Sequence, residues 1–167
     1  MTSESANRDE VIVLGAGCFW GVEDILRQQP GVVSTRVGYA GGHVPAPTYE
    51  QVCSGSTGHA EVVEVRFRQA ETTLDAVLKF FWSHHSATGP NLGQYRSVVI
   101  CSRHQLDTVR AVKDELDAAR ADGDVLATQI LVDVPFYDAE EYHQQYYEKG
   151  REVVREVRRQ CGLPPQS

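Results

Sequence analysis

The sequence predicts an α+β fold in which helices pack on a mixed β-sheet. Short apolar runs of strand length alternate along the chain with segments whose apolar residues recur at helical spacing. One run, EVVEVRFR, alternates apolar and charged residues, the pattern of a strand with one buried face. The length of 167 residues suits one domain around a single core. The pattern leaves the order of the strands open.

The first predicted elements lie before residue 41. VIVL at 11–14 is a short continuous apolar run and predicts a buried strand. Residues 19–29 carry apolar side chains at helical spacing, and Pro30 with Gly31 ends this predicted helix. The segment VVSTRVGYA at 32–40 is predicted as the second strand.

A long loop separates these elements from the next strand. Residues 41–60 contain several glycines and prolines, with a short helical turn expected from about Tyr49 to Cys53. The alternating run at 61–68 predicts a half-buried strand. A helix is predicted from residue 73 to about residue 84.

The second half of the chain continues the alternation. SVVICS at 97–102 predicts a strand, and apolar residues at helical spacing predict a helix over 106–120. QILVDV at 129–134 predicts the last strand, and 139–159 a final helix.

The predicted organisation is a single folded domain over residues 11–160, with a disordered tail at 1–10 and a proline-containing C-terminal tail at 161–167. The opening segment is polar and acidic, unlike a signal peptide, and no apolar run approaches the roughly 20 residues of a membrane-spanning helix. The formal net charge of −7, without a basic stripe, argues against nucleic acid or a membrane surface as a partner.

The four cysteines are widely spaced and form no CxxC pair. This spacing argues against a zinc ribbon or a dense disulfide framework and favours a cytoplasmic protein with reduced thiols. Each cysteine then either packs in the core as an unreactive side chain or takes part in a reaction.

Cys18 stands in the segment GAGCFWG, between a predicted strand and a predicted helix. Small residues allow a tight turn that brings Cys18 to the helix N-terminus, where free N–H groups and the helix dipole favour a thiolate. The flanking Phe19 and Trp20 are suited to form a dry pocket for an apolar substrate group. The residues alone leave two interpretations open, a nucleophile or a buried structural cysteine.

Four separated segments carry a resemblance to a known family: GCFWGVE at 17–23, VGYAGGHVPAPTYEQVCSGSTGHAEVVEV at 37–65, GQYRS at 93–97 and PFYDAEEYHQQYYEK at 135–149. In their order and spacing they resemble the peptide methionine sulfoxide reductase A family. The resemblance covers nearly the whole predicted domain. It implies a two-layer α/β sandwich with a ferredoxin-like mixed sheet. We expect a monomer that needs no cofactor and no metal.

The activity that the resemblance implies is the thiol-dependent reduction of methionine S-sulfoxide, free or in proteins, to methionine. Cys18 matches the attacking cysteine, which ends this step as a sulfenic acid. Glu61 matches the acid that protonates the leaving oxygen, a role that requires burial to keep its carboxyl protonated. On pattern alone, Glu61 would instead be a solvated carboxylate at the start of a strand.

The resemblance also implies the substrate-binding residues. Phe19 and Trp20 match the wall that holds the substrate methyl group, although the pattern alone favours core residues of the first helix. Tyr49 and Tyr95 match the two phenols that hold the sulfoxide oxygen by hydrogen bonds.

The remaining cysteines differ in what the resemblance implies for them. Cys161 is the C-terminal candidate for the resolving thiol, which attacks the sulfenic acid to form a disulfide that thioredoxin reduces. Cys53 stands in a matching segment where it need not be catalytic, and Cys101 is expected to be packing. His59 and His143 are expected to be structural hydrogen-bonding groups.

The sequence departs from the family in the segment 84–97, which is shorter than the usual loop. Asn91 stands nearest to the family's aspartate, in the substrate-binding region, and one residue is missing before Gln94. We expect activity to be retained, because the nucleophile, the acid and both tyrosines persist. Two alternatives are a cysteine hydrolase or acyltransferase that pairs Cys18 with His59 or His143, and a non-enzymatic protein that binds oxidised methionine or only retains the fold.

Overall fold

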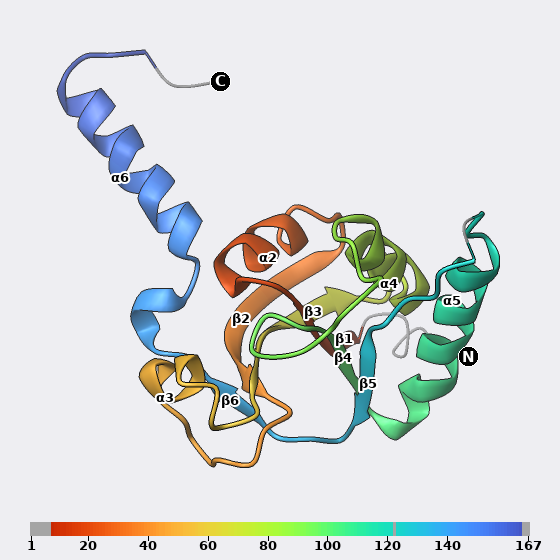
Figure 1. Cartoon of the computed structure of the whole chain (residues 1–167). Helices are drawn as coiled ribbons and strands as arrows, with labels where there is room; N and C mark the ends of the chain where they lie inside the picture. The colour runs from red at the N-terminus through yellow and green to blue at the C-terminus, as the bar shows by residue number, and fades with distance from the viewer. Residues whose placement is uncertain (1–7, 122, 165–167) are drawn as a thin grey trace.

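The computed structural model describes residues 8–121 and 123–164 (Figure 1). Most of the expected N-terminal tail and the last three residues of the expected C-terminal tail lie outside these residues. The first strand, β1, begins at Asp9, so residues 9 and 10 belong to the sheet.

Within the described residues, six strands form one mixed sheet in the order β5-β4-β1-β3-β2-β6. Neighbouring strands are antiparallel except β4 and β5, which are parallel. The α+β class with a mixed sheet is therefore confirmed. The strands are β1 (Asp9–Ala16), β2 (Val32–Ala40), β3 (Ala60–Arg68), β4 (Ser97–Cys101), β5 (Gln129–Val132) and β6 (Phe136–Asp138).

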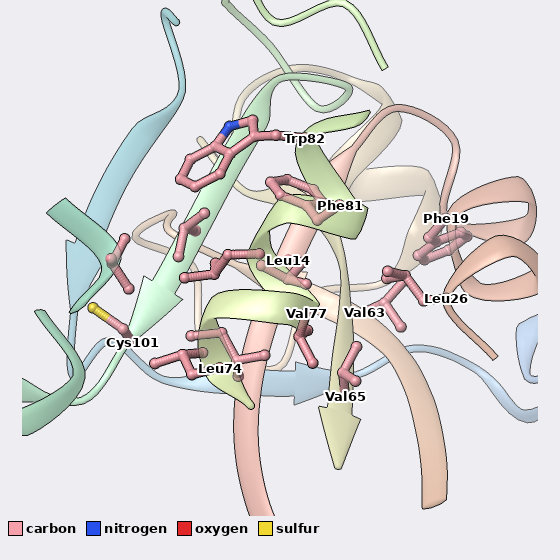
Figure 2. Close-up of a cluster of buried hydrophobic side chains, with 14 of the residues drawn as sticks. Leu14, Phe19, Leu26, Val63, Val65, Leu74, Val77, Phe81, Trp82 and Cys101 are labelled. Atoms are coloured by element: carbon pink, nitrogen blue, oxygen red, sulfur yellow. The ribbon is translucent and has the colours of Figure 1, made fainter. Parts of the chain in front are cut away.

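Helices cover one face of this sheet and enclose the larger core. Figure 2 shows the side chains of α2 and α4 meeting those of β1, β3 and β4, with Phe81 and Leu14 near the centre. A smaller apolar cluster lies on the opposite face of the sheet. The helices are α2 (Phe19–Leu26), α3 (Tyr49–Cys53), α4 (Leu74–Ser83), α5 (Leu106–Ala118) and α6 (Tyr146–Gln160).

The alternating pattern of β3 holds only for its second half. Val65 and Phe67 are buried while Arg66 and Arg68 are exposed, as predicted. The first half is buried on both faces, because β3 lies between β1 and β2 and Val62 packs into the smaller cluster. The pattern-based reading of Glu61 as a solvated carboxylate is wrong, since its side chain is 1 % exposed.

The prediction of a helix from residue 139 is also wrong in its first turns. Glu141–His143 form a 3-10 helix there, and Gln145, directly before α6, has a left-handed backbone with φ of 47°. Residues 136–138 form a further strand, β6, on the edge of the sheet, so the predicted strand at 129–134 is not the last one. The buried carboxylate of Glu23 accepts hydrogen bonds from the backbone N–H and the side-chain amide of Gln145, at 2.7 and 3.0 Å. These contacts stabilise the bend from which α6 begins.

Helix α6 extends away from the rest of the chain (Figure 1). Its base is attached to α2: Tyr146 stacks on Trp20 with ring centroids 3.9 Å apart, and Arg151 forms an ion pair with Asp24. Among the described residues, no helix combines the length and apolar character needed to span a bilayer.

Candidate active site

Cys18 lies where β1 turns into α2. Gly17, directly before it, has φ of +118°, a backbone conformation that favours glycine. Cys18 is the N-cap residue of α2, and its carbonyl accepts the first helical hydrogen bond, from Val22 N–H. The thiol is exposed. The local sequence thus presents an accessible sulfur at the positive end of a helix dipole.

Glu61 brings a carboxyl group to the same helix end. Its Oε1 accepts a hydrogen bond from Phe19 N–H at 3.1 Å, and its Oε2 accepts one from Gln94 Nε2 at 2.7 Å. Gly15 on β1 permits this approach, because a side chain there would meet the Glu61 carbonyl oxygen at 2.8 Å. The carboxyl group is therefore fixed beside the residue that follows Cys18.

The environment of Glu61 favours its protonated form. Burial raises the pKa of Glu61, because desolvation disfavours the charged carboxylate. The hydrogen bonds from Gln94 and Phe19 lower this pKa, and the net change is upward. Glu61 consequently holds its proton to a higher pH than an ordinary glutamic acid, as a proton donor requires.

The hydrogen bond from Gln94 opposes the effect of burial on the pKa of Glu61, and a substitution can remove it. In Gln94→Ala, Glu61 loses a donor to its charged form, so its pKa rises further, and the alkaline fall in the reductase activity that the resemblance implies moves to higher pH. A pH–rate profile measures the shift. Gln28→Ala, an exposed glutamine at the end of α2, is the control and leaves the profile in place. An alkaline limb unchanged by Gln94→Ala would contradict this role.

Two tyrosines and a second cysteine lie around this carboxyl group. A hydrogen bond with Cys53 is the largest cause of the raised pKa of Tyr49, followed by burial. Burial, followed by the charge of Glu61, raises the pKa of Tyr95, whose ring is 53 % exposed. Both phenols therefore keep their protons and can donate hydrogen bonds at neutral pH.

The two aromatic residues after Cys18 occupy different environments. Phe19 is 1 % exposed and packs in the core against Tyr39 and His143. Trp20 is half-buried and donates its indole N–H to His143 Nδ1 at 2.9 Å. Burial lowers the pKa of His143, which keeps its ring neutral and able to accept this bond.

An apolar cavity of about 220 Å³ also opens beside Cys18. Val22, Ile25 and Leu26 of α2 line it together with Phe81 of α4. It offers an apolar surface next to the sulfur, in addition to the predicted aromatic wall.

Asn91 is engaged by the backbone of its own loop and of a neighbouring segment. Its Nδ2 donates to the carbonyl oxygens of Ser97 and Ala127, each at 2.9 Å, and its Oδ1 accepts from Ser97 N–H at 2.6 Å. These three bonds fix the loop that carries Gln94 and Tyr95. Asn91 thus holds the shortened segment in place through backbone hydrogen bonds.

Asn91→Asp is expected to destabilise the fold by about 2–3 kcal/mol at pH 7, because the carboxylate oxygen that replaces Nδ2 would face two carbonyl oxygens without a donor. This contact raises the pKa of the introduced carboxyl above its unfolded value. Stability is therefore retained at acid pH and lost as pH rises through the raised pKa. Urea unfolding at pH 4 and pH 7 measures the difference. Ser86→Asp, on the exposed part of the same segment, is the control.

Six of the eight predicted site residues come together; the exceptions are Asn91, which is bonded to the backbone of Ser97 and Ala127, and Cys161. Cys18, Phe19, Trp20, Tyr49, Glu61 and Tyr95 lie in one region at the N-terminus of α2. Cys161 lies at the far end of α6 and is exposed. Sequence reasoning gave no role to Gln94 or Cys53, although Gln94 directly precedes Tyr95 in one of the matching motifs.

Comparison with known proteins decides which family this geometry represents. The family model described as peptide methionine sulfoxide reductase matches residues 10–165. A relative named peptide methionine sulfoxide reductase MsrA, from Methanothermobacter thermautotrophicus, is 48 % identical over 164 residues, which cover 94 % of each chain. The chain belongs to the peptide methionine sulfoxide reductase family.

Solved structures of other members agree with this assignment. Methionine sulfoxide reductase A of Corynebacterium diphtheriae superposes with a TM-score of 0.75 at 35 % identity, covering 84 % of this chain and 74 % of that one. Mxr1 from Saccharomyces cerevisiae in complex with Trx2 gives a TM-score of 0.58 at 29 % identity, covering 87 % and 89 % of the two chains.

The structure also bears on two other kinds of site, a cysteine hydrolase and a metal centre. The His59 ring bonds to Gly42 N–H and the Val44 carbonyl oxygen, and the His143 ring bonds to Trp20. Both rings are therefore engaged elsewhere than at Cys18, which argues against a hydrolase that pairs Cys18 with His59 or His143. Within residues 8–121 and 123–164, no three His, Cys, Asp or Glu side chains are grouped so that they could hold a metal ion.

Proposed function

We propose that this protein reduces methionine S-sulfoxide, free or within proteins, to methionine. One observation carries the proposal: a buried carboxyl group with a raised pKa accepts a hydrogen bond from the backbone N–H next to an exposed cysteine at a helix N-terminus. This arrangement joins a nucleophile to a proton donor, the two groups that sulfoxide reduction requires.

In the proposed reaction, the Cys18 thiolate attacks the sulfoxide sulfur while Glu61 donates its proton to the sulfoxide oxygen. The oxygen is transferred to Cys18 as a sulfenic acid, and the substrate leaves as a thioether. The two electrons that reduce the substrate come from the Cys18 sulfur. Glu61 is afterwards a carboxylate and is reprotonated from solvent.

Substrate binding is divided between polar and apolar groups. Tyr49 and Tyr95 donate hydrogen bonds to the sulfoxide oxygen. Trp20 supplies the accessible part of the wall for the methyl group, and Phe19 supports it from the core. Asn91 contributes indirectly, by fixing the loop that carries Tyr95.

We propose that the oxidised protein is returned to its dithiol state by thioredoxin through the exposed thiol of Cys161. The complex of the yeast relative Mxr1 with Trx2 supports this choice of reductant. The protein is proposed to act as a monomer in the cytoplasm, where thiols are kept reduced.

The test supplies the purified protein with dithiothreitol and separately with the S- and R-epimers of a methionine sulfoxide peptide. We expect catalytic formation of methionine from the S-epimer only, quantified by chromatography. The R-epimer is the matched control for chemical reduction by dithiothreitol. If the S-epimer is left unreduced, the proposed function is wrong.

A further inference from the structure

A second exposed thiol, that of Cys53, lies within the group of residues around Glu61. We propose that Cys53 is the first resolving thiol of this protein, forming a disulfide with Cys18 before Cys161 takes part. The inference rests on the proposed function, because it begins from the Cys18 sulfenic acid.

Gln94 connects Cys53 with the proton donor. Its Nε2 lies 3.6 Å from the Cys53 sulfur and 2.7 Å from Oε2 of Glu61. The Cys53 sulfur is therefore within two hydrogen-bond lengths of the carboxyl group. The other oxygen of that carboxyl group is bonded to the backbone N–H of Phe19, the residue next to Cys18.

The tyrosines place both sulfurs in the same region. Tyr49 lies close enough to Cys53 for the Cys53 side chain to raise the pKa of its phenol. Tyr95 is close enough to both Cys18 and Cys53 for either thiolate to act on its phenol electrostatically. Residues from α2, α3 and the segment before β4 thus meet around Glu61, and Cys53 is one of them.

The position of Cys53 in α3 allows the approach that a disulfide requires. The two Cα atoms of a disulfide lie within about 7 Å of each other. Cys53 is the last residue of a helix of only five residues, followed by an exposed turn in which Gly55 has φ of +80°. A short helix end joined to a surface turn can shift without disturbing the core.

Cys161 is placed much less favourably for the same step. The base of α6 contacts Trp20 through Tyr146, and 15 helical residues separate that contact from Cys161. At 1.5 Å per residue, this helix holds Cys161 about 22 Å further along its axis. A direct attack on Cys18 would require much of α6 to unwind or to turn back on the domain.

The chemistry of the step balances without an additional reagent. The Cys53 thiol attacks the sulfur of the Cys18 sulfenic acid, the S–S bond forms, and the S–O bond breaks. The hydroxyl group leaves with the thiol proton as water. Transfer of the disulfide to Cys161 by thiol exchange requires the same movement of α6, but it can be slower because the Cys18 sulfur is already protected as a disulfide.

The experiment uses the full reduced chain, freed of dithiothreitol and mixed with one equivalent of a methionine S-sulfoxide peptide. Samples are quenched over time with an alkylating reagent and digested for mass mapping of disulfide-linked peptides. We expect the Cys18–Cys53 linked peptide to appear first in the wild type and to persist in Cys161→Ser. In Cys53→Ser, dimedone is expected to trap Cys18 as the sulfenic acid, and the loss of a second thiol per chain is expected to slow at least about tenfold.

Cys101→Ala is the matched control, because Cys101 is buried on β4, and it gives the same linked peptide as the wild type. A Cys18–Cys161 peptide that forms first, with Cys53 still alkylated, would overturn the inference. So would an unchanged rate at which Cys53→Ser loses its second thiol. If the wild type releases no thioether at all, the proposed function itself is contradicted, because the resolving step comes after product formation.

Discussion

Replacing Cys18 by serine is expected to lower the reduction of methionine S-sulfoxide by at least about 10³-fold, to the background set by the reductant alone. A serine hydroxyl is barely ionised at neutral pH, even at a helix N-terminus, and its oxygen cannot accept the sulfoxide oxygen as a sulfenic acid does. The fold should be kept, because the Cys18 side chain is exposed and the helix begins with its backbone carbonyl. Methionine release in the dithiothreitol assay measures the loss.

Cys101→Ser separates this effect from the general loss of a thiol. Cys101 lies in the core on β4, and burial raises the pKa of its thiol, so it is a poor nucleophile. Its replacement should change the turnover rate less than twofold, with a modest loss of thermal stability. Methionine formation by folded Cys18→Ser at more than a few per cent of the wild-type rate would exclude Cys18 as the nucleophile.

Replacing Glu61 by glutamine is expected to lower kcat by about 10²–10⁴-fold, the usual contribution of a general acid. Glutamine has nearly the same shape and can still accept the hydrogen bond from Phe19 N–H. It cannot transfer a proton to the leaving oxygen. Steady-state kinetics with the S-epimer measure kcat and KM, and we expect the change to fall on kcat.

The pH dependence distinguishes a proton donor from a structural carboxyl group. Burial raises the pKa of Glu61, so the wild-type rate should fall as pH rises through this value and the proton is lost. In Glu61→Gln the residual rate should not show this fall, because no proton is removed. Glu64→Gln, three residues along β3 and half-buried, is the control and keeps the wild-type profile. A Glu61→Gln enzyme with the wild-type alkaline limb would contradict the assignment.

Local patterns predicted most elements of the fold. The apolar run of β1 and the alternating half of β3 specify strands, because burial on one or both faces leaves its period in the sequence. The start of α6 could not be obtained in this way. It is set by the hydrogen bonds between Glu23 and Gln145, residues 122 positions apart, and by the three-residue strand β6. A local sequence pattern cannot predict contacts between residues so far apart in the chain.

Some residues of the candidate site could likewise be predicted from local sequence, and others could not. The glycines, the strand and the helix around Cys18 are adjacent in sequence, so the exposed nucleophile at a helix N-terminus could be predicted from that segment. The carboxyl group was predictable only through the family resemblance, since its own strand pattern points to solvent. Its burial depends on β1 and β2 packing on either side of β3.

The sequence by itself determined an α+β domain, its family and the residue types of a thiol-based reductase. Tertiary structure decided which thiols stand beside the proton donor: Gln94 brings Cys53 to Glu61, whereas α6 carries Cys161 away. The physical reason is that reactivity depends on distances and desolvation between segments far apart in the chain. Those quantities arise only when the sheet and its loops are assembled.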